Sequence, residues 1–586
     1  MLPSDSHRLD KINIMEKFEK NYLISYSCIF PDDSGKLIVD VIKTLPSKKS
    51  IEWVSYLHFR KSTSSINQHD YELFRPLLFN LDGELKNSIL DFLQKVDIRN
   101  YGFIDNVALL ILLDKLLTVH NDNNKELSEA DYSSLMKAYL ICCDERTLNA
   151  DTVDTIDENM DADEFVKIYL PERLKYNDVE YRDFRVELIR SFMFKDFCER
   201  SEKFKPLFEK YLEKMNISNW EETQFFIIDL NNRIKKSVKH FCGIKINPDS
   251  YMKKYLDTMR VNFCNYKPSL DLDFNNIRNK PIYYQGDNKY HILSFNFFID
   301  KLYQGFLFDF AKVLKNEKEV KEINSYPDLK KLIGESFSEK CLFYAIMKGC
   351  FEQTCDVRIS GQELKKCLME GEPDYYLRKG KNIFLFEFKD VMLSAETKHC
   401  NNFDKIVKEL LMQFENCTEE KSTGKIKDKP KGFKQLLNVI ENKLNVIIEN
   451  LDKIELSDDL NVFPIIIYQD CNFDIEGVLY ILNNRFQELL KSRNIPKHYI
   501  RQNLVMFSLT TLIQLEDYFS EEKLDLGQII KGYIIECSLS VRNKTLPFEK
   551  YILRYAIKKK GYNQENTKRY NDIIDCIEKK VIKQAP

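Results

Sequence analysis

The segment GEPDYYLRKGKNIFLFEFK, from Gly371 to Lys389, combines a strongly apolar run with charges at both of its ends. Asp374 opens a short strand, a Lys-Gly turn follows, and the apolar run then closes with Glu387, Phe388 and Lys389. Alternate residues of a strand share one face, so Glu387 and Lys389 point in the same direction. The run predicts a strand that is buried on both faces. Charges at its end carry a desolvation cost that a metal ion and a phosphate would offset.

The residues on either side of this hairpin predict a mixed α/β domain over residues 325–525. A helical pattern, LKKLIGESFSEKCLFYAIM, precedes the hairpin, and the short apolar runs VFPIIIY and NLVMFSL follow it. Helical patterns separate these later runs from each other and from the hairpin. Strands alternating with helices, after a first pair of strands in a hairpin, are typical of a mixed sheet covered by helices.

The rest of the chain divides into four further parts. We expect a small β-containing element in residues 1–65, because NYLISYSCIF and KLIVDVIKTL are rich in β-branched and aromatic residues. Apolar residues at three- and four-residue spacing predict a mostly helical region over 66–275. A hairpin and a helix follow in 276–324, and a basic helical extension occupies 526–586. The predicted fold class is α/β, with a mostly helical N-terminal region before a mixed-sheet domain.

The composition indicates a globular protein with more than one domain. The chain has 586 residues, of which 44% are hydrophobic and 31% charged, and this length exceeds what a single core organises. Its 15 cysteines are scattered without a CxxC pair, so we expect buried thiols in a reducing compartment and no structural zinc. The sequence shows no signal peptide and no long uncharged apolar stretch, which predicts a cytoplasmic protein without a membrane span.

Charge is distributed unevenly although the net charge is only −3. Residues 121–164 contain 13 Asp and Glu against 3 Lys and Arg, and a solvated face explains this run. Residues 541–586 contain 12 Lys and Arg against 5 Asp and Glu. Lys558, Lys559 and Lys560 in this end are candidate contacts to a nucleic-acid backbone, and a solvated tail is the alternative.

Four positions along the chain match the pattern of a known enzyme family. Glu339 on a predicted helix, Pro373-Asp374, Glu387-Phe388-Lys389 and Gln435 on a later helix occur in this order. The order resembles that of the PD-(D/E)xK phosphodiesterase superfamily, which includes the restriction-endonuclease-like enzymes. The resemblance is confined to the predicted mixed-sheet domain and implies a restriction-endonuclease-like fold there. It says nothing about the first 320 residues.

The resemblance implies a divalent metal as cofactor, Mg²⁺ with Mn²⁺ able to replace it. Hydrolysis of a phosphodiester develops negative charge on the attacking and leaving oxygens, and a hard cation neutralises this charge. Asp374 and Glu387 would hold the metal, and the resemblance adds the backbone carbonyl of Phe388. Lys389 would orient or help deprotonate the attacking water and offset the charge of the phosphate.

The resemblance to the PD-(D/E)xK superfamily implies supporting roles for two further residues. Glu339 corresponds to a helix carboxylate that orients metal-bound waters in many members of the superfamily, and Glu335, one helical turn earlier, is the alternative. Gln435 corresponds to a position that supports the site or contacts the nucleic-acid backbone. A bare E-x-K triplet is not informative in so charged a chain, since Glu319-Val320-Lys321 is another.

These observations predict a Mg²⁺-dependent nuclease that acts on DNA, with a role in defence against foreign DNA or in repair by analogy only. The helical N-terminal half would serve recognition or contact a protein partner. The alternative is a non-catalytic scaffold or nucleic-acid-binding protein that carries a nuclease-like domain. A simpler interpretation of the hairpin itself is that Glu387 and Lys389 lie at a solvated strand end. Motifs for phosphate loops and dinucleotide binding are lacking in the sequence.

Overall fold

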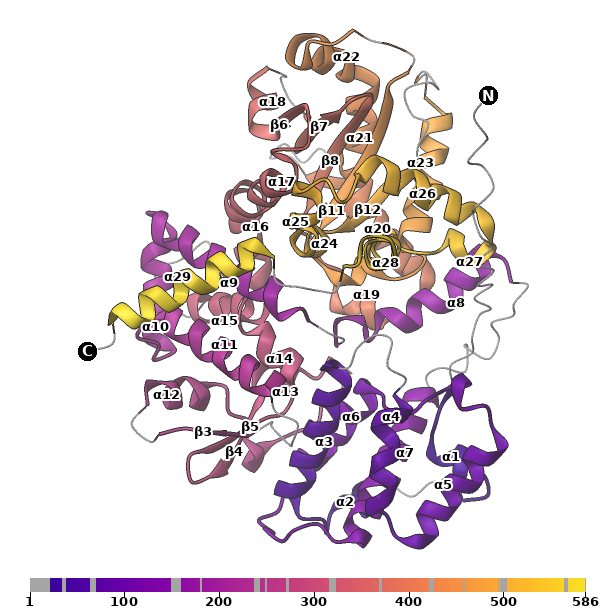
Figure 1. Cartoon of the computed structure of the whole chain (residues 1–586), viewed down its shortest axis with the longest axis vertical. Coiled ribbons are helices and arrows are strands. Elements are labelled where there is room, and N and C mark those ends of the chain that lie inside the picture. Colours follow the sequence, from indigo (N-terminus) through magenta and orange to yellow (C-terminus); the bar gives the residue numbers. More distant parts are fainter. Residues whose placement is uncertain are drawn as a thin grey trace.

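A five-stranded mixed sheet forms the centre of the C-terminal half in the computed structural model of the chain (Figure 1). The strand order is β12-β11-β8-β7-β6. Strands β6, β7 and β8 are successively antiparallel, whereas β11 and β12 run parallel to β8. The strands comprise β6 (Val357–Ser360), β7 (Tyr375–Lys379), β8 (Asn382–Lys389), β11 (Asn461–Tyr468) and β12 (Val505–Ser508).

The structure describes most of the chain. The described residues are 22–33, 38–63, 70–148, 160–179, 182–236, 243–247, 250–269, 273–315, 323–367, 371–420, 426–455, 457, 459–493, 495, 503–562 and 567–584. Their secondary structure is mostly helical, with mixed sheets, and an α/β class fits it. The part of the sequence prediction that concerns Glu319 to Lys321 lies outside these residues.

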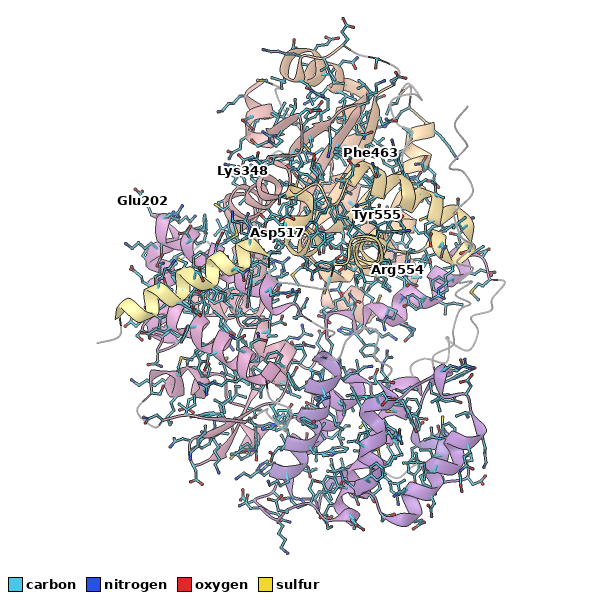
Figure 2. The ribbon with its side chains drawn as sticks, in the orientation of Figure 1. Glu202, Lys348, Phe463, Asp517, Arg554 and Tyr555 are labelled. Carbon is cyan, nitrogen blue, oxygen red and sulfur yellow. The ribbon has the colours of Figure 1, made fainter. Side chains whose placement is uncertain are left out.

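The apolar run of the quoted segment becomes β8, as its sequence predicts. Strand β8 is central in the sheet, between β7 and β11, and its residues 383–388 are all buried. The ring of Phe384 stacks on that of Phe463 in β11, with centroids 5.0 Å apart. Phe463 is labelled in Figure 2. Gly380, in the turn before β8, has a φ of 57°, a left-handed conformation that glycine adopts without a steric cost.

Helices of the C-terminal half pack on the strands of the sheet. Helix α21 packs on β8 and β11, while α28 and α23 pack on β12. A π-helix, Gly334–Phe343, connects α16 to α17 without a break. The α-helices described in this half are α16 (Tyr326–Ile333), α17 (Tyr344–Phe351), α18 (Gly361–Cys367), α19 (Ala395–His399), α20 (Phe403–Phe414), α21 (Gly432–Asn442), α22 (Leu444–Ile447), α23 (Val478–Lys491), α24 (Leu509–Gln514), α25 (Glu516–Ser520), α26 (Leu526–Leu539), α27 (Val541–Lys544), α28 (Phe548–Lys560) and α29 (Lys568–Gln584). A second hairpin, β9 (Asn416–Glu420) and β10 (Ile426–Pro430), follows α20.

The N-terminal part of the chain has a hydrophobic core of its own. This core is built mainly from α1–α7 and includes Leu109, Leu113 and Tyr139. The larger core runs continuously from α8 through the sheet to α29, so the helices expected in 66–275 contribute to both cores. The helices before the sheet domain are α1 (Tyr26–Ile29), α2 (Ile38–Ile42), α3 (Ser47–Thr63), α4 (Tyr71–Phe74), α5 (Gly83–Lys95), α6 (Asn106–Thr118), α7 (Glu129–Leu148), α8 (Ala162–Leu174), α9 (Phe184–Arg200), α10 (Phe204–Lys214), α11 (Trp220–Lys236), α12 (Tyr251–Thr258), α13 (Asn275–Asn279), α14 (Phe295–Asp300) and α15 (Gln304–Lys315).

The β-containing element expected in residues 1–65 is mainly helical in its described residues, and its strand is limited to the two-residue β1 (Tyr22–Leu23), which pairs with β2 (Tyr101–Gly102). Within the run KLIVDVIKTL, residues Ile38–Ile42 form α2, because Ile38 and Ile42, four residues apart, are both buried on one side of a helix that packs against α7. Tertiary burial overrides the β preference of branched residues here.

The hairpin expected after residue 280 is present. Strands β4 (Ile282–Gly286) and β5 (Lys289–Ile292) are joined through Asp287 and Asn288, which both have positive φ. A third strand, β3 (Gly243–Lys245), pairs with β5.

The basic C-terminal extension is helical, as the sequence predicts, and part of its charge has structural partners. Helix α29 packs across α9 and α11 rather than extending away from the protein (Figure 1). Arg569 makes two hydrogen bonds, of 2.7 and 2.6 Å, to the Glu516 carboxylate, and Lys580 pairs with Glu221 at 3.0 Å. These two cations therefore hold α29 in place.

Two further expectations concern the whole chain. The thirteen cysteines whose side chains the structure describes are free thiols, and the expectation that they are mostly buried is wrong, because four are buried, seven are half-buried and two are exposed. Among the described residues, helices that combine the length and the apolar character needed to cross a bilayer are lacking.

Candidate active site

Strands β7 and β8 bring Asp374 and Glu387 together at one end of the sheet. Tyr375 pairs with Phe386 across the two antiparallel strands, so Asp374, one residue earlier, lies beside Glu387. The Asp374 carboxylate also accepts a 2.7 Å hydrogen bond from the backbone N–H of Phe388. The carboxylate is thus fixed against the strand that carries the other residues of the predicted site.

Glu387 and Lys389 form an ion pair on one face of β8. Lys389 Nζ lies 2.5 Å from Glu387 Oε1, and the side chain of Glu387 is only 2% exposed. The second oxygen of Glu387, Oε2, is buried and has no hydrogen-bond partner among the described residues. These charges do not lie at a solvated strand end, so the simpler interpretation of the hairpin is wrong. A buried carboxylate oxygen without a protein partner is costly, and coordination of a cation would offset this cost.

The charges of the site perturb one another. Burial raises the pKa of Asp374 well above its ordinary value, and the negative charge of Glu387 adds to this increase. Burial likewise raises the pKa of Glu387, against the opposing effect of the Lys389 ammonium. Burial would lower the pKa of Lys389, but the carboxylates of Glu387 and Asp374 outweigh it and the pKa is raised. Two crowded carboxylates with raised pKa values are an arrangement that a cation would stabilise.

Glu339 reaches the same site from the π-helix. Its carboxylate accepts a 2.7 Å hydrogen bond from the Tyr344 hydroxyl, and its negative charge contributes to the raised pKa values of Asp374 and Glu387. The alternative residue, Glu335, is 71% exposed and pairs with Lys340 at 2.6 Å. The structure therefore favours Glu339 over Glu335 as the helix carboxylate of the site.

The contacts within this helix follow its π geometry. Glu339 contacts Tyr344 and Glu335 contacts Lys340, so both pairs are five residues apart. In an α-helix, residues five apart lie about 140° apart around the axis and do not meet. The wider π-turn brings them onto one side. Sequence reasoning missed Tyr344 because helical periodicity assumes α geometry.

Gly361 is a second residue that the sequence did not single out. Its backbone N–H donates a 2.8 Å hydrogen bond to the carbonyl oxygen of Asp374. A Cβ at this position would lie 3.0 Å from that oxygen and 3.1 Å from the Tyr344 hydroxyl. Glycine therefore lets the start of α18 approach Asp374 and Tyr344 closely. The feature of the sequence from which this role could have been predicted is the position of Gly361 directly after β6.

Gln435 supports the site through the backbone. From the first turn of α21, its Nε2 donates a 3.0 Å hydrogen bond to the carbonyl oxygen of Glu372, two residues before Asp374. The negative charge of the Glu372 side chain contributes to the raised pKa of Glu387. This hydrogen bond holds the backbone segment that leads into Asp374.

The basic cluster Lys558–Lys560 is not brought to these residues. The three lysines are exposed in the last turn of α28, and α28 packs on β12, the strand at the opposite edge of the sheet from β6. Strand β11 lies between β12 and the strand that carries Glu387. The cluster is therefore carried by a helix that packs two strands away from β8.

The donor set of the site fits a hard cation, although side chains supply only part of it. Within the described part of the chain, no group of three or more His, Cys, Asp and Glu side chains is arranged to hold a metal. Mg²⁺ needs only one or two carboxylates, with water and substrate oxygens completing its shell. Asp374 and Glu387, with the unpartnered Oε2 of the latter, meet this requirement.

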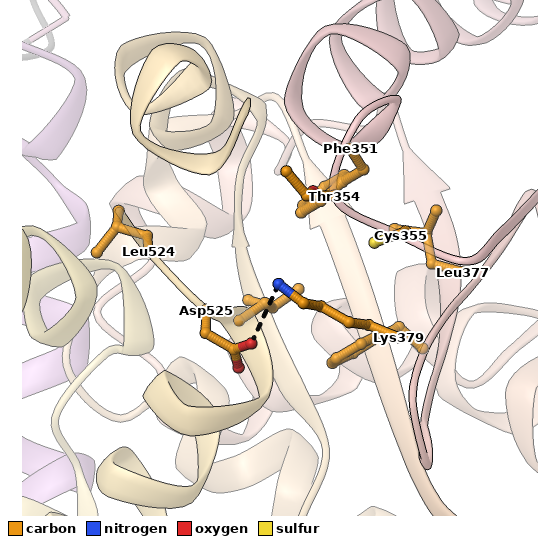
Figure 3. A pocket seen from close by; sticks show the side chains of 9 residues that line it. Phe351, Thr354, Cys355, Leu377, Lys379, Leu524 and Asp525 are labelled. Carbon is orange, nitrogen blue, oxygen red and sulfur yellow. Dashed lines mark ion pairs between the residues drawn. The ribbon is translucent and has the colours of Figure 1, made fainter. Parts of the chain in front are cut away.

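A small pocket elsewhere in the sheet domain does not belong to this site (Figure 3). It is lined by Phe351, Cys355, Lys379 and Asp525, among others, and Lys379 pairs with Asp525 at 3.6 Å. Lys379 ends β7, whereas Asp374 immediately precedes its first residue. The pocket therefore lies at the other end of the strand.

Neither protein-family models, nor curated proteins, nor solved structures give a match to the chain.

Proposed function

We propose that this protein is a metal-dependent nuclease that hydrolyses phosphodiester bonds, with DNA as the substrate. The observation that carries the proposal is the buried pair of Asp374 and Glu387 beside Lys389, in which Glu387 Oε2 lacks a protein partner among the described residues. Crowded carboxylates next to a lysine at a sheet end are poor for stability and suited to binding a cation and a phosphate. The PD-(D/E)xK resemblance of the sequence supports the same chemistry.

Asp374 and Glu387 would hold Mg²⁺, or Mn²⁺ in its place, and the Phe388 carbonyl is the further ligand that the resemblance implies. The bound metal would supply charge neutralisation for the phosphodiester oxygens. Lys389 keeps its proton, because Glu387 and Asp374 raise its pKa. In the metal-free protein Lys389 is thus a hydrogen-bond donor, and with a metal bound it would orient or help deprotonate the attacking water and offset the charge of the phosphate.

Glu339 would accept a hydrogen bond from a water at the site, since the Tyr344 hydroxyl already orients its carboxylate. Gln435 would keep Asp374 in place through the Glu372 carbonyl. The helical N-terminal half would serve recognition of the nucleic acid or of a protein partner, and a role in defence or repair remains an analogy.

The test is cleavage of plasmid DNA by the purified protein with Mg²⁺ or Mn²⁺. We expect Asp374→Ala and Lys389→Ala to abolish cleavage. Lys381→Ala is the matched control, because Lys381 lies in the turn of the same hairpin, is 67% exposed, and forms its ion pair with the exposed Asp459. Cleavage that survives both site substitutions would refute the assignment. If the wild-type protein cleaves neither DNA nor RNA with either metal, the scaffold alternative is favoured.

A further inference from the structure

Asp390, the residue after Lys389, connects the strand of the site to the helix that carries Glu339. Its carboxylate accepts a 2.6 Å hydrogen bond from the Ser338 hydroxyl and pairs with the Lys330 ammonium of α16. The side chains of Lys330 and Asp390 are 11% and 7% exposed, and Ser338 is fully buried. Charge-assisted hydrogen bonds in such surroundings are stronger than those on the surface.

The hydrogen bond joins the sequence neighbours of two site residues. Ser338 precedes Glu339, and Asp390 follows Lys389. Strand β8 ends at Lys389, so Asp390 is the first residue beyond the strand, and its contacts with Ser338 and Lys330 place it against the π-helix and α16.

The Phe388 side of the strand also carries an aromatic contact to the π-helix. The ring of Phe388 stacks on that of Phe343, with centroids 4.8 Å apart and planes inclined by 11°. One polar and one aromatic contact therefore fix the π-helix to the end of β8. Phe388 lies on the face of β8 opposite to that of Glu387 and Lys389, so the aromatic contact leaves the side of the ion pair free.

Residues from the helical region before the sheet domain also lie close to Asp390 and to the residues that follow it. The negative charge of Asp390 adds to the effect of burial in raising the pKa of Tyr303 and of Tyr326. Gln304, in the first turn of α15, donates a 2.9 Å hydrogen bond to the Tyr326 hydroxyl and lies 3.7 Å from the sulfur of Met392. Residues from α15, α16 and the π-helix thus surround the residues that follow the site strand.

We propose that Asp390 is a positioning residue, and that Lys330, Ser338 and Asp390 form a clamp that fixes Glu339 relative to Glu387 and Lys389. The proposal rests on the proposed nuclease function, because the placement of these groups matters for a reaction only if they act on one substrate. A displacement of about 1 Å in a reacting group costs up to about a hundredfold in rate. Asp390 contacts Ser338 and Lys330, and it acts on the site through its sequence neighbours.

The test uses Ser338→Ala in the full chain. This substitution removes the hydrogen bond to Asp390 and leaves the Lys330–Asp390 ion pair intact. Ser336→Ala is the matched control: its hydroxyl donates a 2.9 Å hydrogen bond to the Leu332 carbonyl of the preceding helical turn. Cleavage of plasmid DNA at saturating Mg²⁺ gives kcat and KM, and hydrogen–deuterium exchange of residues 334–343 reports on the clamp without requiring activity.

We expect Ser338→Ala to lower kcat by about tenfold or more while KM changes little, and to accelerate exchange in the π-helix. Ser336→Ala should match the wild type in both measurements. If the wild type cleaves DNA and Ser338→Ala cleaves it with the same kcat, the positioning role is refuted. If the wild type cleaves nothing, the proposed function fails, and the exchange then decides the clamp: equal exchange in Ser338→Ala and wild type overturns it.

Discussion

The carboxylate of Asp374 accepts a 2.7 Å hydrogen bond from the backbone N–H of Phe388, on the strand that carries Glu387 and Lys389. This bond holds the two carboxylates of the site close together across β7 and β8. The protein keeps two acidic side chains next to each other at a buried position, and this arrangement reduces stability unless a cation is bound. Substitution of either carboxylate, or of the lysine beside them, should therefore change stability as well as activity.

Asp374→Asn should stabilise the metal-free protein at neutral pH. The folded-state pKa of Asp374 lies above the ordinary value of 3.8, so the folded protein retains a proton that the unfolded chain releases. Stability is therefore lost as pH rises from the ordinary pKa through the raised one, by about 1.4 kcal/mol for each pKa unit. In EDTA, Asp374→Asn should have a higher Tm than wild type at pH 7.5, and the difference should shrink toward pH 4.

Added Mg²⁺ or Mn²⁺ provides the complementary measurement. A ligand that binds only the folded state raises its stability, so the wild-type Tm should rise with metal concentration while that of Asp374→Asn should not. Asp91→Asn, on the exposed surface of α5, is the control for removal of one negative charge. Equal metal-induced shifts in wild type and Asp374→Asn would contradict metal binding at this carboxylate.

Lys389→Met should destabilise the protein, and Glu387→Gln should compensate. Loss of the ammonium leaves the buried carboxylate of Glu387 without its counter-ion, which typically costs about 3–5 kcal/mol when one partner of a buried pair is removed. The double variant leaves neither charge behind and should recover most of this loss. Urea unfolding at pH 8 of the wild type, both single variants and the double variant measures the coupling. A double variant as unstable as Lys389→Met would exclude the ion pair as the cause.

Charge reversal at Lys558, Lys559 and Lys560 should weaken binding of DNA without changing the chemistry of the site. The three side chains are exposed and on a helix that packs at the far edge of the sheet. A lysine that neutralises one phosphate contributes about 0.9 to the slope of log affinity against log salt, so its reversal should make this slope shallower. Binding isotherms over a series of salt concentrations measure the slope. Unchanged affinity at low salt would restrict the cluster to a role in solubility.

Acid should weaken the N-terminal core through His58. This side chain of α3 is fully buried, both ring nitrogens lack partners among the described residues, and burial lowers its pKa from 6.5 to about 4. The folded state therefore binds fewer protons than the unfolded state between these values. Stability should fall as pH decreases from 6.5 toward 4, by up to roughly 3 kcal/mol.

His58→Leu should flatten this pH dependence. The chain has two tryptophans, Trp53 in the N-terminal core region and Trp220 in the larger core, so Trp220→Phe leaves a fluorescence signal from the N-terminal core alone. Urea unfolding of Trp220→Phe with and without His58→Leu, at pH 7 and pH 5, gives the comparison. An identical loss of stability on acidification in both proteins would assign it to other groups.

The central strand of the sheet domain and the turn before it could be predicted from the sequence, because their local patterns agree with the tertiary structure. The apolar run before Glu387 became a buried central strand, and the Lys-Gly pair became its turn. The prediction of strands in the N-terminal runs is wrong because burial overrode the local preference. Ile38 and Ile42 fit a strand pattern and a helix pattern equally, and packing against α7 selected the helix.

The sequence by itself determined that Glu387 and Lys389 share a face at the end of a buried strand, because side chains of a strand alternate. It also placed Asp374 at the head of the neighbouring strand. The tertiary structure alone decided between Glu335 and Glu339, since a π-helix shifts which residues meet and sequence periodicity does not contain this shift. It alone brought Gly361 against Asp374 and Ser338 against Asp390. Such contacts depend on the packing of whole elements, and no local pattern specifies them.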